Sequence, residues 1–398
     1  MAVARSRRSP RHAGHDAADG AARPEGRHTI AQRTAEFGFD PAFVQLNHAS
    51  FGAPTLTALD RLAEQHRRIE RDPAVRLGDG LTGDLAPVRR LVAELLGADP
   101  GQVALVANAT EASGALATSL PLAPGEGVAL LDVEYESVLR GWRERCARAG
   151  ARCTVLTTPV PATPASLLET LDSAPRDTRY FVVSAITSST ALRVPVAEVA
   201  GLAAARGASV VLDAAHLVGH ESWDVAGSGV LAAFGSLHKW LPVPRPCGFL
   251  WLSSPVLDVV RPAAVALHYD EDLAARFAWR GTWDPAPTLG LPEAVEEWTR
   301  WGLAGDLERA AALADLATDE LEAAGWRPTG SAPLRPARIR AFVVPVPLAA
   351  LRDAAEASAL RLWTGTAPDG RTLARIATHV WTDEADVARV VALARALH

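Results

Sequence analysis

The stretch ASVVLDAAH, residues 208–216, decides the fold class of this 398-residue chain. Its apolar run does not alternate with polar residues, which is typical of a strand covered on both faces in a parallel sheet. The predicted strand ends at Asp213, a carboxylate that is costly to bury without a partner. An N-cap for the following turn is the structural alternative for this residue. The end of this strand is therefore the first candidate position for a site.

Similar apolar runs alternate with helical patterns over residues 100–255. We expect strands within 103–109, 127–135, 178–187 and 247–252, and helices within 110–120, 136–150 and 195–207. Strands joined by helices predict an α/β fold with a large domain, built on a mainly parallel sheet flanked by helices. After residue 290, a long Ala/Leu/Glu helix, two strands and a last helix predict a smaller α+β C-terminal domain.

The composition excludes several classes of protein. With 48% hydrophobic and 22% charged residues the chain has a globular profile, and its net charge of −6 gives no reason to expect nucleic acid as a partner. No run of 18 apolar residues predicts a membrane span. Three cysteines without a CxxC pair favour a reducing cytoplasm, and we expect no metal site. The basic run at residues 4–15 is interpreted as part of a flexible tail.

Polar residues follow each predicted strand, where open α/β sheets bind their ligands. They lie at residues 108–110, 134–135, 187–189, 213–216 and 236–239. Among them are one of the two asparagines, Asn108, and one of the 3 tyrosines, Tyr135. A helix that begins just after residues 108–110 would direct N–H groups and its positive dipole end toward an anion. These residues predict a site that includes a phosphate.

Lys239 is the only lysine among the 40 lysine and arginine residues. A guanidinium stays protonated, whereas a lysine amine with a lowered pKa can attack an aldehyde and form a Schiff base. The structural alternative is an ordinary surface lysine. The nearby Asp213 favours the chemical role, because a carboxylate of this kind commonly pairs with the protonated ring nitrogen of pyridoxal phosphate.

Eight segments of the chain occur in the order seen in class V aminotransferase-fold enzymes. They are residues 46–55, 108–112, 132–140, 184–196, 212–219, 235–251, 277–295 and 375–381. From about residue 40 to the C-terminus the chain resembles the isopenicillin N epimerase-like branch, which includes cysteine C–S lyases. The resemblance implies the fold type I architecture, pyridoxal phosphate and a homodimer with shared active sites. We expect a tail at 1–28, a segment near the active site at 29–55, a cofactor-binding domain at 56–290 and a small domain at 291–398.

The resemblance also implies roles for individual residues. Lys239 matches the lysine that holds the cofactor and Asp213 the carboxylate at its ring nitrogen, so both are expected to be catalytic. The other expected cofactor-binding residues are Asn108, Ala109, Thr110, Tyr135, Thr187, His216, Ser236, His238, Gly281 and Thr282. Tyr135 matches the residue that stacks on the ring, and Gly281–Thr282 the segment that reaches the phosphate of the partner subunit. The expected substrate-binding residues are Asn47, His48 and Arg375, with Arg375 on the α-carboxylate.

Three positions depart from the family pattern. Ala185 stands where relatives usually have histidine, Leu237 where many have cysteine, and Trp283 where arginine is common. These changes lie around the substrate, so they weaken the transfer of a specific reaction more than the transfer of the cofactor.

Several reactions remain open after the cofactor is assigned. β-Elimination from an S-substituted cysteine asks least of the protein and is our first expectation. An epimerase needs a second proton donor, for which Tyr269 and His268 are candidates, although a solvated loop is an equal alternative; Tyr269 is therefore also expected near the substrate. Deamination or transamination, with or without decarboxylation, is a further alternative. A desulfurase needs a cysteine on a mobile loop, and an inactive binding protein would not need Lys239 and Asp213 together.

Overall fold

A seven-stranded mixed sheet is the centre of the larger part of residues 29–397, the part of the chain that this computed structural model describes. The tail expected at residues 1–28 lies outside the described residues. The strand order is β2-β8-β7-β6-β5-β3-β4, and all neighbours run parallel except β8, which is antiparallel to β2 and β7. The bounds are β2 Val103–Val106, β3 Gly127–Leu131, β4 Arg152–Leu156, β5 Thr178–Ser184, β6 Ser209–Asp213, β7 Ala232–Ser236 and β8 Gly248–Leu252. The prediction of an α/β fold with a mainly parallel sheet is confirmed.

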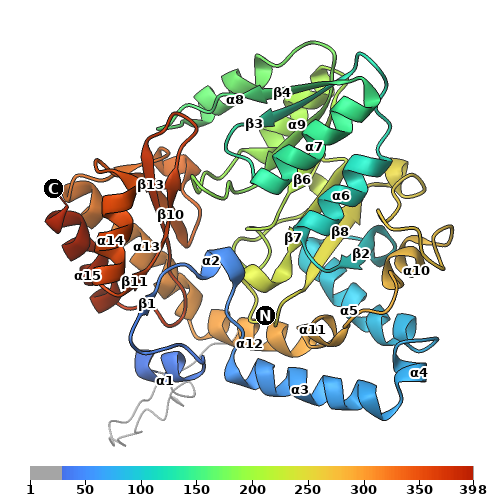
Figure 1. Cartoon of the computed structure of the whole chain (residues 1–398), viewed down its shortest axis with the longest axis horizontal. Coiled ribbons are helices and arrows are strands. Elements are labelled where there is room, and N and C mark those ends of the chain that lie inside the picture. The colour runs from blue at the N-terminus through green and yellow to red at the C-terminus, as the bar shows by residue number, and fades with distance from the viewer. Residues whose placement is uncertain (1–28, 398) are drawn as a thin grey trace, which may run out of the picture.

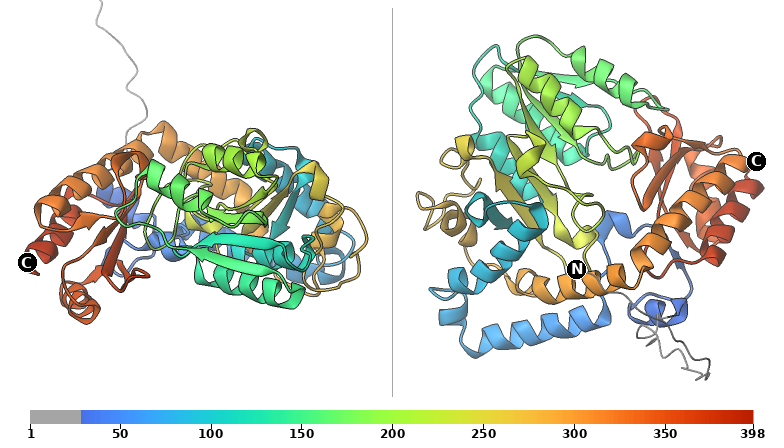
Figure 2. Two further views of the ribbon diagram at one scale, coloured as in Figure 1. Left: turned by 90° about the horizontal axis from the view of Figure 1, so that it is seen from above. Right: turned by 180° about the vertical axis from the view of Figure 1, so that it is seen from behind.

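Helices cover both faces of this sheet (Figures 1 and 2). One face packs against α6 (Ala109–Ser119), α7 (Glu136–Ala149) and α10 (Leu273–Ala278). The other packs against α5 (Leu81–Leu96), α8 (Pro164–Asp172), α9 (Val196–Ala205) and α12 (Leu291–Leu303). Because both faces are covered, nearly every residue of the central strands is buried, which explains their apolar runs without alternation.

The smaller part of the molecule is built on a four-stranded antiparallel sheet in the order β12-β13-β10-β9 within the described chain. Its strands are β9 Arg327–Pro328, β10 Ile339–Val343, β12 Trp363–Thr366 and β13 Thr372–Ala377. Three helices, α13 (Asp306–Ala323), α14 (Leu348–Ala357) and α15 (Glu384–Ala396), share a separate hydrophobic core with it. This arrangement is the α+β C-terminal unit that the sequence predicts.

The N-terminal segment connects the two parts. After α1 (Ile30–Ala35), β1 (Val44–Gln45) pairs in parallel with β11 (Leu360–Arg361) of the small domain. The chain then forms α2 (His48–Phe51) and α3 (Leu56–Arg71) along the large domain (Figure 1). The remaining short helices are α4 (Pro73–Arg76) and α11 (Ala286–Leu289). None of the helices within the described residues combines the length and the apolar character that crossing a membrane requires.

The packing refines the expected boundary at residue 291. Leu291, Ala294 and Val295 of α12 belong to the core of the large sheet, whereas Val44 and Leu46 belong to the core of the small domain. We therefore propose that the small domain begins near α13 and includes the short strand β1.

Candidate active site

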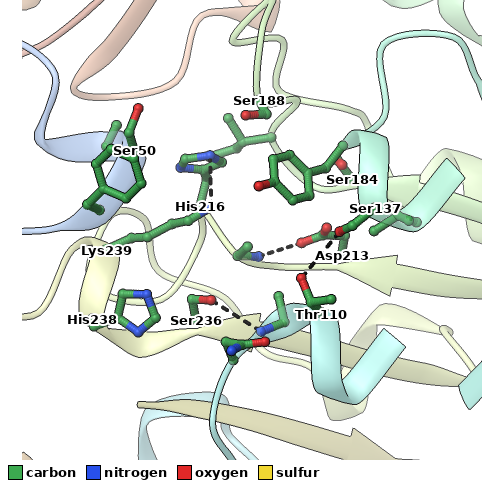
Figure 3. A pocket seen from close by; sticks show the side chains of 18 of the residues that line it. Ser50, Thr110, Ser137, Ser184, Ser188, Asp213, His216, Ser236, His238 and Lys239 are labelled. Atoms are coloured by element: carbon green, nitrogen blue, oxygen red, sulfur yellow. Dashed lines mark hydrogen bonds between the residues drawn. The ribbon is translucent and has the colours of Figure 1, made fainter. Parts of the chain in front are cut away.

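A cavity of about 380 Å³ lies at the carboxyl ends of the central strands (Figure 3). The large domain, the small domain and the N-terminal segment all contribute to its wall. The residues expected at the site that line it are Asn47, Asn108, Ala109, Thr110, Tyr135, Asp213, His216, Ser236, His238, Lys239 and Arg375. The polar residues that follow the predicted strands therefore lie around one cavity in the structure.

Lys239 lies in the short 3-10 turn that follows β7 and extends into the cavity. Its Nζ is 3.4 Å from Nε2 of His216 and 5.9 Å from the ring centroid of Tyr135. Burial lowers the pKa of Lys239 to about 8, with Asp213 opposing and Arg375 adding to the change. A substantial fraction of this amine is therefore neutral near physiological pH, as attack on an aldehyde requires.

The turn that carries Lys239 is held by close backbone packing against the N-terminal segment. Gly52 follows α2 with φ of 71°, and a Cβ at this position would come within 1.6 Å of the carbonyl oxygen of His238. Only glycine combines this backbone conformation with such a close approach. Gly52 thereby brings α2, with Asn47 and Ser50, to the rim of the cavity.

Trp240 determines the tautomer of His216. The indole Nε1, which can only donate, lies 3.4 Å from Nδ1 of His216, so Nδ1 is the acceptor. The imidazole is neutral, because burial keeps the pKa of His216 well below its ordinary value, and its proton is consequently on Nε2. Nε2–H is the nitrogen that faces Lys239, where it can donate to the neutral amine.

Asp213 ends β6 on the floor of the cavity. Its Oδ1 accepts a hydrogen bond of 2.8 Å from the backbone N–H of Ala215. Burial raises the pKa of Asp213, while the charge of Lys239 and the Ala215 hydrogen bond oppose that change. A buried carboxylate that lines the cavity, and whose charge is balanced by few neighbouring groups, is suited to bind a cationic group of a ligand.

The start of α6 lines the cavity with capping and hydroxyl side chains. The Asn108 side chain caps the helix by accepting from the N–H of Glu111 at 3.0 Å, and Ser236 Oγ accepts from the N–H of Ala109 at 3.3 Å. Thr110 Oγ1 and Ser137 Oγ lie 3.2 Å apart at the same end. Hydroxyl groups at the positive end of a helix are suited to a phosphate.

Arg375, in β13, supplies a cation from the small domain. One guanidinium nitrogen donates to the carbonyl oxygen of Ser188 at 2.5 Å, and the other to Ser50 Oγ at 2.8 Å and Asn47 Oδ1 at 3.2 Å. No carboxylate of the described residues forms an ion pair with it, and burial lowers its pKa to about 10. A buried arginine without an acidic partner is suited to a carboxylate of a ligand.

Five expected residues do not line the cavity of this chain. Thr187 is fully buried and its hydroxyl bonds Thr190 and the N–H of Leu192, because β5 already ends at Ser184. His48 is buried and packs edge-on against Trp240 at 4.8 Å between ring centroids. Tyr269, Gly281 and Thr282 lie in the segments around α10 and are not among the lining residues. For Gly281–Thr282 the expectation concerned the partner subunit.

Other lining residues were not anticipated. They are Ala49, Ser50, Phe51, Ser137, Val138, Ser184, Ile186 and Trp363, whereas Ser188 and Ala215 fall within the expected strand-end ranges 187–189 and 213–216. Ser184 pairs in register with Asp213, so a correct end of β5 would have identified it. The buried Glu134 fixes the position of Ser184. It accepts hydrogen bonds from the Ser184 hydroxyl and, at 3.1 Å, from the Ser184 backbone N–H. Burial raises the pKa of Glu134 to about 8.

The chain is similar to several known proteins. The family model described as aminotransferase class-V matches residues 56–360. Isopenicillin N epimerase of Streptomyces clavuligerus is 32% identical over 277 residues, which cover 65% of this chain and 69% of that protein. Putative L-cysteine desulfhydrase 1 of Oryza sativa subsp. japonica is 30% identical over 298 residues, which cover 69% of this chain and 61% of that protein.

More distant similarities point in the same direction. Hercynylcysteine sulfoxide lyase of Schizosaccharomyces pombe is 21% identical, with coverage of 58% of this chain and 60% of that protein. The matched regions thus span about three fifths of this lyase and of the desulfhydrase. A cystine C–S lyase in complex with cysteine persulfide superposes with a TM-score of 0.77 at 19% identity, covering 88% of this chain and 97% of that chain. This structural similarity shows the fold.

Proposed function

This chain belongs to the class V aminotransferase family of pyridoxal-phosphate-dependent enzymes, and from this premise we propose that it is a C–S lyase acting on an S-substituted cysteine. The proposed reaction is β-elimination, which converts the substrate and water into a thiol, pyruvate and ammonia. The members of the family named above include proteins described as L-cysteine desulfhydrase and hercynylcysteine sulfoxide lyase, which supports this class of reaction.

The groups around the cavity fit pyridoxal phosphate. Lys239 would hold its aldehyde carbon, Asp213 its ring nitrogen, and the N-terminus of α6 with Ser236 its phosphate. Their chemical types match: a partly neutral amine, a buried carboxylate, and a positive helix end with hydroxyl groups. When bound, pyridoxal phosphate accepts the electron pair that is released when a bond to Cα breaks.

The groups of the cavity that can transfer a proton favour β-elimination over the alternative reactions. Lys239 takes the proton from Cα, and the electron pair then displaces sulfur from Cβ as a thiolate, which leaves as a thiol after protonation. His216 Nε2–H faces the same amine and favours its neutral, proton-accepting form. None of the three cysteines, all within the described residues, lines the cavity, so the sulfur acceptor of a desulfurase is missing from this wall. β-Elimination needs only one base, Lys239, and a leaving group on Cβ of the substrate.

The substrate would be oriented by its carboxylate. Arg375 offers a buried guanidinium that already touches Asn47 and Ser50 of the N-terminal segment. Phe51, Tyr135 and Trp363 provide apolar surface at the same cavity, and the Phe51 side chain is 69% exposed. An S-substituent with apolar groups could cover this surface, which supports a bulky thioether rather than free cysteine.

An epimerase is the second candidate. It is supported by the 32% identity with isopenicillin N epimerase and by the phenol of Tyr135 in the cavity, a group that can carry a second proton. Tyr135 replaces Tyr269 and His268 in this role, because neither of those residues lines the cavity.

We also propose a cytoplasmic homodimer. Val265 and Leu267, in the segment before α10, are 79% and 77% exposed, and an apolar loop of this kind is suited to an interface. Gly281 and Thr282 follow α10, so the same surface would bring them toward a partner subunit. The free cysteines support a reducing location.

Product analysis tests the proposed reaction. We expect the enzyme loaded with pyridoxal phosphate to release pyruvate, ammonia and thiol in equal amounts from S-benzyl-L-cysteine. Lys239→Ala should release none. Exchange of the Cα hydrogen with deuterium and inversion of Cα, without pyruvate, would replace the lyase with the epimerase. Sulfane sulfur on the protein would indicate a desulfurase.

A further inference from the structure

A second cavity, of about 490 Å³, lies behind the active site. We call it the rear cavity. The segment that follows β6 forms one wall with Gly219 and Trp223, while α12, α13 and the start of β10 form the other with Trp298, Glu308 and Arg338. The rear cavity shares no lining residue with the catalytic cavity.

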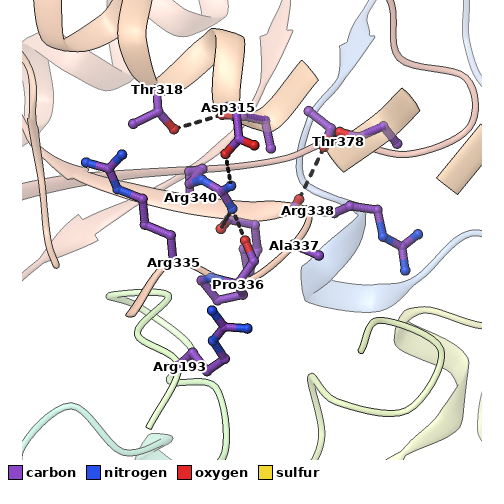
Figure 4. A network of polar contacts seen from close by, with 12 residues as sticks. Arg193, Asp315, Thr318, Arg335, Pro336, Ala337, Arg338, Arg340 and Thr378 are labelled. Atoms are coloured by element: carbon purple, nitrogen blue, oxygen red, sulfur yellow. Dashed lines mark hydrogen bonds and ion pairs between the residues drawn. The ribbon is translucent and has the colours of Figure 1, made fainter. Parts of the chain in front are cut away.

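Arg338 is the unusual group in this wall. Its side chain is 2% exposed, one terminal nitrogen donates to the carbonyl oxygen of Gly219 at 2.5 Å, and Nη1 has no hydrogen-bond partner. Figure 4 shows it together with Arg193, Arg335 and Arg340, with its guanidinium group directed away from them. Each of those has an acidic partner, at 3.3 Å for Arg193, 3.5 Å for Arg335 and 2.6 Å for Arg340. Among the described residues, no carboxylate forms an ion pair with Arg338.

A buried cation without an ion pair is unfavourable, and burial lowers the pKa of Arg338 to about 10, a change that the charges of Glu221 and Glu308 oppose. Two other buried arginines of the described chain also lack an ion pair: Arg276, in α10, and Arg375, which lines the catalytic cavity. Because an anion would satisfy the free N–H groups of Nη1, the guanidinium of Arg338 is suited to a carboxylate.

The rest of the rear cavity determines what kind of carboxylate fits. Glu308, exposed on α13, forms no ion pair or hydrogen bond within the described chain and lines the same cavity. Trp223 and Trp298 add apolar walls, with Trp298 fixed by a 3.0 Å hydrogen bond from Nε1 to Gly219. A cation, an anion and two indoles therefore surround one space.

We propose that the rear cavity is a binding site for an α-amino acid in its zwitterionic form. Arg338 binds the carboxylate, Glu308 the ammonium group, and Trp223 and Trp298 contact the side chain. A simple inorganic anion satisfies Arg338 alone and faces the carboxylates of Glu221 and Glu308, so the amino acid is the better match. Binding of an amino acid at this site does not depend on which reaction takes place at Lys239.

The rear cavity is also next to the residues behind Lys239. The guanidinium carbon of Arg338 is 5.1 Å from the ring centroid of Trp240, and His220 stacks on the same indole at 3.8 Å. Trp240 in turn donates to His216. A ligand bound to Arg338 would therefore be separated only by that side chain from Trp240, which determines the tautomer of His216.

Calorimetry with a non-reacting probe tests the proposal on the holoenzyme. N,N-Dimethyl-L-phenylalanine keeps the carboxylate and the ammonium charge, but its tertiary amine cannot condense with an aldehyde. We expect a site that Arg375→Met retains, and about tenfold or greater weakening of that site in Arg338→Met, the loss typical of a charged hydrogen bond. Glu308→Gln is a second variant, at an exposed position where the substitution is not expected to affect folding. It should reduce the preference for this probe over 3-phenylpropionate, which lacks the ammonium group.

Three results would overturn the proposal. Absence of binding by the wild-type protein at millimolar probe would show that the rear cavity is only a solvated gap. Loss of binding in Arg375→Met would place the probe in the catalytic cavity. Equal affinity for the two probes would exclude recognition of the ammonium group and with it an amino-acid site.

Discussion

Trp240 donates a hydrogen bond of 3.4 Å from its indole Nε1 to Nδ1 of His216, and this contact leaves the proton of the imidazole on the nitrogen that faces Lys239. Trp240, which directly follows Lys239, thus determines whether His216 presents a donor or an acceptor to the lysine amine. With Nε2–H as a donor, the neutral amine gains a hydrogen bond, whereas the ammonium form has no acceptor there. Trp240 is a positioning residue that acts through His216.

Trp240→Phe tests this role in the apoprotein. Without the indole donor, His216 can place its proton on Nδ1 and accept from the ammonium form of Lys239 through Nε2. We expect the pKa of Lys239 to rise by about 0.5 to 1, the equivalent of one net hydrogen bond. Competitive labelling with trace acetic anhydride across a pH series measures this pKa, since Lys239 is the only lysine.

Trp142→Phe is the matched control for that experiment. Trp142, in α7, is also buried, its Nε1 has no hydrogen-bond partner, and it is not among the lining residues. Its loss should leave the pKa of Lys239 unchanged. An unchanged pKa in Trp240→Phe as well would show that the tautomer does not matter to the amine.

The pH dependence of Lys239 reactivity is the second prediction. Because burial lowers the pKa to about 8, the amine is protonated below that pH and neutral above it. Labelling of the apoprotein should rise about tenfold per pH unit up to pH 8 and then level off. In the unfolded chain, with the ordinary value of 10.5, it should keep rising past pH 10. A plateau only above pH 10 in the folded protein would contradict the burial argument.

Asp213→Asn is the third change. The amide keeps the shape of the side chain but cannot balance a cationic ring nitrogen, so we expect the turnover number to fall on the order of 10²-fold or more. The absorption band of the bound cofactor should shift as well. Asp132→Asn is the control, because Asp132 caps the N–H of Thr158 at 2.9 Å and does not line the cavity. Equal losses in both variants would indicate a general loss of structure.

The strand ends explain how much of the site could be predicted from sequence. Asp213 and Ser236 are the last residues of β6 and β7, so buried apolar runs located them. Thr187 does not line the cavity, because β5 ends three residues earlier, at Ser184, and the apolar run does not mark that end. Ser50, Phe51 and Trp363 reach the cavity through packing of α2 and the small domain, which depends on contacts between distant segments. Local pattern carries no information on such contacts.

Arg375→Ala separates substrate binding from catalysis. The guanidinium of Arg375 has no acidic partner in the described chain, so we expect it to bind the substrate carboxylate. Its loss should raise KM for S-benzyl-L-cysteine on the order of 10²-fold, with a smaller effect on kcat. The primary amide of the same substrate is the control, because the wild-type preference for the free acid should disappear in the variant. A retained preference would assign carboxylate binding to another residue.

Sedimentation velocity tests the proposed dimer. Val265 and Leu267 expose apolar surface next to α10, and burying them against a second chain would remove that surface from water. We expect wild-type protein to sediment at twice the 42.0 kDa of the chain, and Val265→Asp with Leu267→Asp to give monomers. The monomers should also bind pyridoxal phosphate more weakly, because Gly281 and Thr282 would no longer reach the partner's phosphate. Leu303→Asp is the control: Leu303 is 86% exposed at the end of α12, and its charge should leave the dimer intact. A wild-type monomer with full cofactor occupancy would show that each chain completes its own site, and the roles proposed for Gly281 and Thr282 would then be wrong.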